Sequence, residues 1–484
     1  MPVYLVGAGP GDPELITVKG RRLLERADVI LYDRLAHPKL LDWAHLKAER
    51  IYVGKEGSDH SMVQADIAAL MIDRAKAGKT VVRLKGGDPL LFGRASEELT
   101  ALVTAGVPFE IVPGVTSVSG VAAYTGVPLT HPGLSDSVAM VSGHDPDAVD
   151  WAATRGLSTL ALFMGASQFE DISSRLVKAG WAADTPALAV RWGTRTSQRS
   201  IAGTLASLPA LIADAKLTPP ILILIGQVVG LRDRFNWFER LPLFGQRIVI
   251  TRDQSQSQSR QLAERLNALG AEVIECPVIE IRPLKFSTAG IDQYDWIIFT
   301  SVNGVRHFLN RLTDLRQVKG RIAAVGASTQ AAIESFRLSV DRVPREYVAE
   351  GLVEAFAGDD LAGKRILIPR AAVARDLAPS ALRKQGAIVD TLDVYETVLP
   401  ESAAARAAEA FRVKPDWVTF TSSSTVNNLL SVLDAAKLEG VLVASIGPVT
   451  SDALLKQALT VTCQANPHTM DGLVEAIMRH RLVV

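Results

Sequence analysis

The stretch "VYLVGAGPGDPELIT", from Val3 to Thr17, begins as a short apolar strand that runs directly into a glycine turn. A dinucleotide-binding turn follows the pattern G-x-G-x-x-G at the start of a helix. Counted from Gly7, the third glycine falls on Asp12, and Pro10 removes a backbone N–H that would hold a pyrophosphate. We therefore predict an α/β domain that opens on this strand and turn and binds something other than a dinucleotide.

The composition limits the class of protein. Its 484 residues are too many for one core and suggest two to four domains, and a hydrophobic content of 48% indicates a globular chain. Lys+Arg and Asp+Glu both number 52, so there is no overall charge to attract nucleic acid or a membrane. Cys276 and Cys463 form no C-x-x-C pair, and the eight histidines show no ligand spacing, so we expect no metal. The N-terminus has no basic leader and the longest aliphatic run, "ILILIG" from Ile221, is too short for a bilayer, which favours a cytoplasmic protein.

Short apolar strands alternate with amphipathic helical stretches along the whole chain, as in "DVILYD", "RIVITRD" and "WIIFTS". This alternation predicts an α/β architecture with largely parallel sheets. Charged and aromatic residues concentrate between Leu231 and Arg247, with Pro242 and Gly245 as breakers. We therefore predict two domains, residues 1–240 and residues 241–484.

The second half contains an internal repeat. "DWIIFTSVNGV" from Asp295 matches "DWVTFTSSSTV" from Asp416 at an offset of 121, and Gly326 pairs with Gly447 at the same offset. Such a repeat predicts two similar lobes, about 245–280 plus 398–484 and about 284–396, each a small doubly wound sheet. Ligands of such sheets bind beyond the carboxyl ends of the strands, so we expect the two "FTS" turns to line a cleft.

Three turns of the first half carry unusual residues: "GAGPGDP", "RLKGGDPLLFGR" and "VPGVTSVSGVAAYTGVPLTHP". Gly86 and Gly87 allow close approach to the backbone, and the Asp88 carboxylate can accept hydrogen bonds from two hydroxyls, as from a ribose. Each turn taken alone is also explained by ordinary strand-to-helix turn chemistry.

In this order, and together with "ADVILYDRL", "LFMG" and "GT", these strings resemble the S-adenosylmethionine-dependent tetrapyrrole methylases, most closely the uroporphyrinogen-III C-methyltransferases. The resemblance covers about Pro2–Glu239 and implies two α/β subdomains, a homodimer formed through this half, and a glycine turn that floors a cofactor pocket. The residues that it assigns to S-adenosylmethionine are Pro10, Gly86, Gly87, Asp88, Leu91, Thr116, Ser117, Met164 and Gly193.

The resemblance also places the acid and base of methyl transfer on Asp33 and Lys55. A reduced pyrrole is an enamine-like carbon nucleophile, and after methylation a proton must leave the macrocycle, which gives a carboxylate such as Asp33 a role as base. Lys55 would donate a proton or pair with substrate carboxylates. The ordinary alternatives are a helix cap for Asp33 and a solvated surface lysine for Lys55.

The second half has no catalytic triad, nucleophile elbow or phosphate loop, and offers hydroxyls and glycines at strand ends instead. Its duplicated pattern, over about Leu243–Arg479, resembles uroporphyrinogen-III synthase, which closes hydroxymethylbilane into a ring while inverting the last pyrrole. We expect Tyr395 to assist loss of the substrate hydroxyl, unless it is a packing tyrosine, and the "FTS" hydroxyls also have an ordinary role as helix caps. The predicted substrate-binding residues are Arg252, Thr300, Ser301, Asn303, Gly304, Arg370, Ser422, Ser423, Thr450 and Ser451.

The two resemblances support each other, because the product of the second half would be the substrate of the first. Together they predict a bifunctional enzyme that makes uroporphyrinogen III and methylates it twice to precorrin-2, towards sirohaem or cobalamin. Two alternatives stay open: an active methylase joined to an inactive tetrapyrrole-binding or docking module, and a two-lobed ligand sensor.

Overall fold

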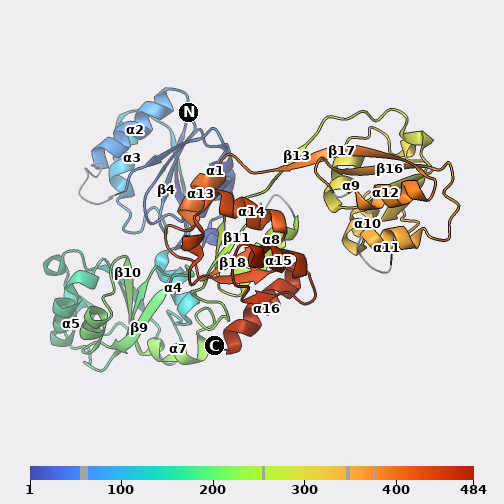
Figure 1. Cartoon of the computed structure of the whole chain (residues 1–484). Coiled ribbons are helices and arrows are strands. Elements are labelled where there is room, and N and C mark those ends of the chain that lie inside the picture. The colour runs from blue at the N-terminus through green and yellow to red at the C-terminus, as the bar shows by residue number, and fades with distance from the viewer. Residues whose placement is uncertain (55–63, 253–256, 345–348, 375, 484) are drawn as a thin grey trace. The chain divides into compact units, whose positions relative to one another are not determined.

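The computed structural model describes residues 1–54, 64–252, 257–344, 349–374 and 376–483. The chain divides into two compact units, Met1–Gln246 with Leu266–Glu272, and Arg247–Arg265 with Val273–Val484. Each unit is built around two five-stranded sheets (Figure 1). None of the helices in the described ranges combines the length and the apolar character needed to cross a bilayer.

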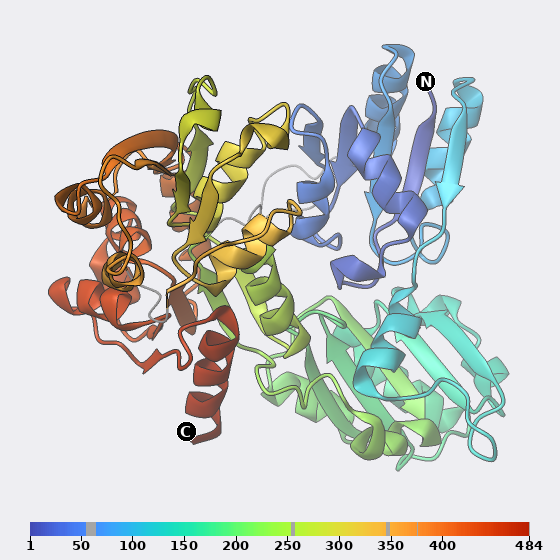
Figure 2. The ribbon, with the colours of Figure 1, turned by 90° about the vertical axis from the view of Figure 1, so that its right-hand side faces the viewer.

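The first sheet is parallel throughout, and its central strands consist mainly of buried Val, Ile and Leu residues and are covered on both faces. Helices α2 (Gln64–Lys76) and α3 (Ala95–Thr104) pack on one face, and α1 (Val18–Arg26) packs on the other (Figures 1 and 2). In spatial order its strands are β3 (Glu49–Tyr52), β2 (Val29–Tyr32), β4 (Val81–Lys85), β1 (Val3–Gly7) and β5 (Phe109–Val112). The turns that follow β1, β4 and β5 therefore meet at one edge of the sheet.

The second sheet of this unit is mixed, which departs from the largely parallel sheets predicted. Among its pairs only β6 and β7 are parallel, and β10 pairs antiparallel with both β7 and β8. Strands β8 and β9 are joined by a short connection, residues 192–198, which favours the antiparallel pair that they form. The aliphatic run from Ile221 is the fully buried central strand β10. In spatial order the strands are β6 (Val138–Ser142), β7 (Thr159–Phe163), β10 (Ile221–Gly226), β8 (Pro186–Arg191) and β9 (Arg199–Thr204). The helices of this part are α4 (Ser117–Thr125), α5 (Phe169–Lys178), α6 (Leu208–Asp214) and the short α7 (Arg232–Phe235).

The two sheets of the second unit share a run of four equivalent strands, and each adds a fifth strand at a different edge. One sheet runs β12 (Glu272–Glu275), β11 (Arg247–Ile250), β18 (Trp417–Phe420), β19 (Leu442–Ser445) and β20 (Cys463–Gln464). The other runs β13 (Glu280–Pro283), β17 (Ile388–Val398), β16 (Arg365–Ala371), β14 (Trp296–Phe299) and β15 (Arg321–Ala324). The repeated sequence blocks fall on β14 and β18 and on β15 and β19, so the predicted duplication and α/β class are confirmed.

The helices of the second unit flank these two sheets. Around the β11 sheet they are α8 (Ser257–Ala268), α13 (Ala403–Ala410), α14 (Ser423–Val432), α15 (Pro448–Lys456) and α16 (Met470–Val483). Around the β14 sheet they are α9 (Val302–Leu309), α10 (Ala327–Glu334), α11 (Ala349–Ala355) and α12 (Leu377–Lys384). The chain passes from one lobe to the other along β13 and β17, which pair antiparallel (Figure 1).

Candidate functional site

Three glycines bring the strand-end turns of the first sheet into backbone contact. A Cβ on Gly7 would lie 2.5 Å from Gly114 Cα and 2.8 Å from Gly87 O, so no side chain fits there. The Gly87 N–H donates to Gly9 O at 2.7 Å, and Gly87 adopts a φ of +66°. Close packing of the three turns therefore accounts for the absence of side chains at these positions.

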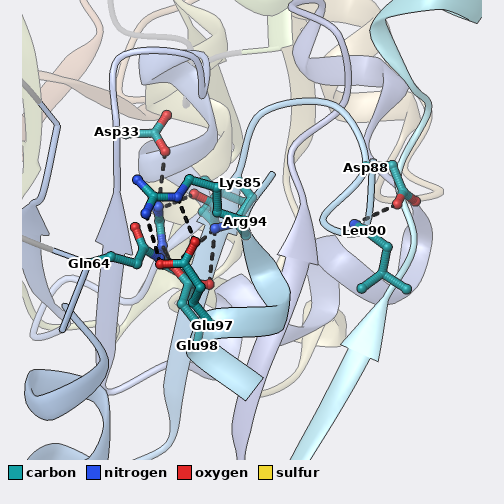
Figure 3. Close-up of polar contacts among 10 residues, drawn as sticks. Asp33, Gln64, Lys85, Asp88, Leu90, Arg94, Glu97 and Glu98 are labelled. Atoms are coloured by element: carbon teal, nitrogen blue, oxygen red, sulfur yellow. Dashed lines mark hydrogen bonds and ion pairs between the residues drawn. The ribbon is translucent and has the colours of Figure 1, made fainter. Parts of the chain in front are cut away.

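Asp88 ties the second turn to the third. One of its carboxylate oxygens accepts the Leu90 N–H at 2.9 Å (Figure 3). The other accepts the Gly114 N–H at 3.1 Å. The Leu91 N–H bonds to the Asp88 carbonyl at 3.3 Å. Each carboxylate oxygen has a second lone pair, so Asp88 retains capacity to accept a hydroxyl.

Contacts between the first turn and the second sheet bring Pro10 and Gly193 into one region. Gly11 lies against Gly193, where a Cβ on Gly11 would be 2.6 Å from the Gly193 carbonyl oxygen. The Asp12 N–H donates to Thr194 Oγ1 at 2.8 Å. A Cβ on Gly120 of α4 would be 2.6 Å from Pro10 Cβ, so packing against α4 gives Pro10 a structural role.

Thr116 and Ser117 lie at the start of α4, next to the glycine turns. Thr116 Oγ1 is buried and finds no hydrogen-bond partner among the described residues. Ser117 Oγ would lie 3.3 Å from a Cβ added to Gly87. A buried hydroxyl without a partner is costly, so this position fits a ligand that supplies the missing bond.

Backbone strain collects in the loops after β4, β7 and β8. Of the eight non-glycine residues with positive φ in the described part of the chain, five lie in these loops. They are Phe92, Arg94, Met164, Trp192 and Thr194, with φ between 51° and 66°. Such strain persists where the surrounding structure enforces it, commonly at binding sites. Met164, at 49% exposure, is accessible to a ligand.

Asp33 follows β2, and each of its carboxylate oxygens accepts a hydrogen bond. Its Oδ1 accepts the Leu35 N–H at 3.0 Å, which is the local turn cap, and its Oδ2 accepts a hydrogen bond from Arg83 Nη2 at 3.1 Å. Its side chain is partly exposed, so the carboxylate can reach a substrate. Lys55 lies outside the described residues.

A group of charged residues that the sequence reasoning missed stands behind Asp33. Arg83 and Lys85 on β4 and Glu98 on α3 are all buried. Both cations form ion pairs with the Glu98 carboxylate (Figure 3). Burial, helped by the Arg83 guanidinium, lowers the pKa of the Lys85 ammonium. The signal was present in "TVVRLKGGD", where two cations occupy alternate positions of an otherwise apolar strand.

Arg195 was also missed, and it lies beside the strained loop after β8. Its guanidinium stacks on the Trp192 ring, 4.2 Å from the centroid, and its Nη2 donates to Leu35 O at 2.8 Å. Arg34 lies over the same ring at 5.8 Å. Burial lowers the pKa of Arg195 to about 10, so the group remains a cation at neutral pH. Two cations on one indole make this region suitable for carboxylates.

In the second unit, the structure places Tyr395, Ser301 and Gly304 together. The Tyr395 hydroxyl lies 3.2 Å from Ser301 Oγ, and the Tyr395 ring tilts over His307 at 5.6 Å. Ser301 also caps α9 by accepting the Gly304 N–H at 3.0 Å. Accepting this bond uses a lone pair of Ser301 Oγ and not the hydroxyl hydrogen. The Ser301 O–H therefore remains able to donate to the Tyr395 oxygen. Thr300 and Asn303 lie next to Ser301 in this turn.

Four of the other predicted residues of the second unit make side-chain contacts within that unit. Arg370 Nη1 pairs with Asp376 at 3.1 Å, and Ser422 Oγ caps α14 by accepting the Thr425 N–H at 3.3 Å. The Ser423 hydroxyl donates to Val449 O at 3.2 Å, and Ser451 donates to Gln464 Oε1 at 2.7 Å. Thr450 is buried, and burial lowers the pKa of the half-buried Arg252. Substrate binding by this set remains a prediction.

The described residues contain no group of three or more His, Cys, Asp or Glu side chains arranged to hold a metal ion. Burial raises the pKa of both thiols, Cys276 and Cys463, to about 11.

Comparison with known proteins finds two family matches in the chain. Residues 2–209 match the Tetrapyrrole (Corrin/Porphyrin) Methylases, and residues 260–475 match Uroporphyrinogen-III synthase HemD. Porphyrin biosynthesis protein HemD of Ruminiclostridium josui is 34% identical over 493 residues, which covers 98% of this chain and 97% of that protein. Uroporphyrinogen-III C-methyltransferase of Bacillus subtilis is 39% identical over 346 residues, covering 69% of this chain and 70% of that protein.

Among solved structures, the chain is similar to the uroporphyrin-III C-methyl transferase of Thermus thermophilus, crystallised with S-adenyl homocysteine. The identity is 40%, and the match covers 48% of this chain and 100% of that protein with a TM-score of 0.42.

Proposed function

The chain belongs to the family of proteins that fuse a tetrapyrrole methylase with a HemD uroporphyrinogen-III synthase domain, and from this we propose that it catalyses two consecutive steps of tetrapyrrole synthesis. The second half, residues 241–484, closes hydroxymethylbilane to uroporphyrinogen III with inversion of the last ring. The first half, residues 1–240, transfers two methyl groups from S-adenosylmethionine to that product and yields precorrin-2. The observation that carries the proposal is the pair of family matches along a single chain.

We assign the cofactor site to the turns at the edge of the first sheet. S-adenosylmethionine, when bound, supplies a sulfonium methyl group that is already activated for transfer. Asp88 would accept a ribose hydroxyl, and the turn at Gly86 and Gly87 would lie beside the nucleoside. The unpaired Thr116 hydroxyl and the strained, exposed Met164 support this assignment. Pro10, Leu91, Ser117 and Gly193 complete the proposed site.

Asp33 is the proposed base of the methyl transfer. Its carboxylate is restrained on both oxygens yet keeps a free lone pair on each, so it can receive the proton that leaves the methylated macrocycle. Arg34 and Arg195, stacked on Trp192, would pair with the carboxylates of the substrate. Lys55 would supply the matching proton donor, as predicted from the sequence.

A coupled assay tests the proposed function as a whole. The full chain is incubated with hydroxymethylbilane and S-adenosylmethionine, and the products are separated by chromatography. We expect uroporphyrinogen III followed by its dimethylated product. If only the uninverted isomer forms at the spontaneous rate, while added uroporphyrinogen III is still methylated, the second half is an inactive tetrapyrrole-binding module.

Thr116→Val tests the cofactor assignment. Loss of a hydrogen bond of about 1 kcal/mol should weaken binding of S-adenosylhomocysteine by roughly fivefold in calorimetry. The melting temperature should not fall, because the hydroxyl has no partner among the described residues. In the control Thr125→Val, on the same helix, the lost hydroxyl donates to Val121 O at 2.6 Å, so stability should fall and affinity should not. Unchanged affinity in Thr116→Val would remove Thr116 from the site.

Tyr395→Phe tests the synthase half. If the hydroxyl assists departure of the substrate hydroxyl, formation of uroporphyrinogen III should slow by about 10²-fold. A tyrosine that only packs would tolerate phenylalanine, because the ring contact with His307 is kept. The control is Tyr294→Phe in the same lobe, which removes a hydroxyl bonded to Asp390 at 2.8 Å and should leave the rate unchanged. Equal rates for both variants would assign Tyr395 to packing.

A further inference from the structure

Four charged side chains form a chain from the core of the first sheet to its edge (Figure 3). Glu98 on α3 is 0% exposed, Arg83 and Lys85 on β4 are 5% and 6% exposed, and Asp33 at the outer end is 23% exposed. Gln64 Nε2 of α2 donates to Glu98 Oε1 at 2.6 Å, and the Arg83 Nε donates to this same oxygen. Only the outermost member therefore has access to a substrate.

The Arg83 guanidinium is held on three sides. Nη1 donates to Leu84 O at 2.9 Å, Nε donates to Glu98 Oε1 at 3.2 Å, and Nη2 donates to Asp33 Oδ2 at 3.1 Å. A planar guanidinium fixed at Nε and Nη1 has no remaining rotation. The direction of its Nη2 donor, and with it the position of the Asp33 oxygen, is therefore set by the core of the sheet.

The balance of charges in this group indicates which carboxylate neutralises the Arg83 guanidinium. Lys85 Nζ bonds to both Glu98 oxygens at 3.0 Å, so these two residues form a neutral pair without Arg83. The positive charge of Arg83 is then balanced by Asp33. Burying a guanidinium is unfavourable, and apolar residues in its place are often more stabilising. The buried Arg83 guanidinium therefore has one evident use, which is to hold the Asp33 carboxylate in a fixed position.

We propose that Arg83 is a positioning residue for methyl transfer, which orients the Asp33 carboxylate towards the proton that it removes, with Glu98 as the anchor of the guanidinium. The inference rests on the proposed function of Asp33. Arg83 itself is too deeply buried to touch the substrate. The Leu35 N–H on the second carboxylate oxygen completes the restraint. A reacting group misplaced by about 1 Å loses on the order of 10²-fold in rate.

The test is Arg83→Met, measured by steady-state methylation of uroporphyrinogen III. Methionine fills the space of the arginine stem and leaves the neutral Glu98–Lys85 pair intact, so no unpaired charge is buried. We expect kcat to fall about 10²-fold, with KM for uroporphyrinogen III and affinity for S-adenosylhomocysteine within about twofold of the wild type. Arg74→Met is the matched control, because Arg74 pairs with Glu49 and Asp73 at the surface of the same unit, and its kcat should stay unchanged.

A double variant separates positioning from a general structural role. If Arg83 acts through Asp33, Arg83→Met should cause no further loss of kcat in an Asp33→Asn background. If the two losses multiply instead, Arg83 acts independently of Asp33 and the proposal is wrong. Should Arg83→Met fail to fold, Arg83→Lys decides, because its single ammonium cannot span Glu98 and Asp33 and should also lower kcat. Full activity in Arg83→Lys would overturn the proposal.

The outcomes also separate this inference from the proposed function. If the wild-type chain transfers no methyl group to uroporphyrinogen III, the proposed function fails. If the wild type is active and Arg83→Met is equally active, only the positioning role fails.

Discussion

Asp33→Asn is expected to lower kcat for methylation of uroporphyrinogen III by about 10²- to 10⁴-fold, the usual contribution of a positioned acid or base. Asparagine has the shape of aspartate and can still accept the Leu35 N–H, so the turn after β2 should keep its conformation. Binding of S-adenosylhomocysteine, measured by calorimetry, should remain unchanged because Asp33 is outside the proposed cofactor set. The loss should therefore appear in kcat.

Asp28→Asn provides the control for this change. Asp28 is exposed and lies directly before the first residue of β2, whereas Asp33 follows its last residue. Its carboxylate also accepts a backbone N–H, that of Thr80 at 2.8 Å. The substitution has the same chemistry at the opposite edge of the sheet, so turnover should not change. If Asp33→Asn behaved in the same way as Asp28→Asn, Asp33 would have only its turn-capping role.

The second large effect is expected for Gly7→Ala. The added methyl group would lie 2.5 and 2.6 Å from backbone atoms of Gly114 and 2.8 Å from Gly87 O, and no side-chain rotation can relieve such contacts. The three turns must separate, so we expect the free energy of unfolding to fall by about 3 kcal/mol. Affinity for S-adenosylhomocysteine should fall as well, since these turns form the floor of the proposed site.

Gly230→Ala is the matched control, because a Cβ added at Gly230 would have nothing within 4 Å and the φ of this residue is not positive. It should leave stability unchanged or raise it by a few tenths of a kcal/mol. Thermal unfolding of both variants, with and without S-adenosylhomocysteine, measures the two effects together. If Gly7→Ala retained wild-type stability and affinity, the contact between the turns would not be required.

The sequence alone determined the α/β class, the duplication in the second half and the three turns at the edge of the first sheet. These features depend on local signals, namely the period of apolar residues and the placement of Gly, Pro and Asp, and so they can be recognised from neighbouring residues. The repeated blocks at an offset of 121 became equivalent neighbouring strands in two sheets, β18 and β19 in one and β14 and β15 in the other. The family resemblance rested on the same short strings.

Only the tertiary structure decided why the glycines are needed and which side chains work together. Gly7, Gly87 and Gly114 come from three turns far apart in the chain, and their backbone contact follows from strand order. Asp33 meets Arg83 at a separation of 50 residues, and Arg83 meets Glu98 at 15. Pairing of charges in a core depends on which strands become neighbours and which helix covers them. That is a property of packing over long distances in the chain, and local sequence patterns do not encode it.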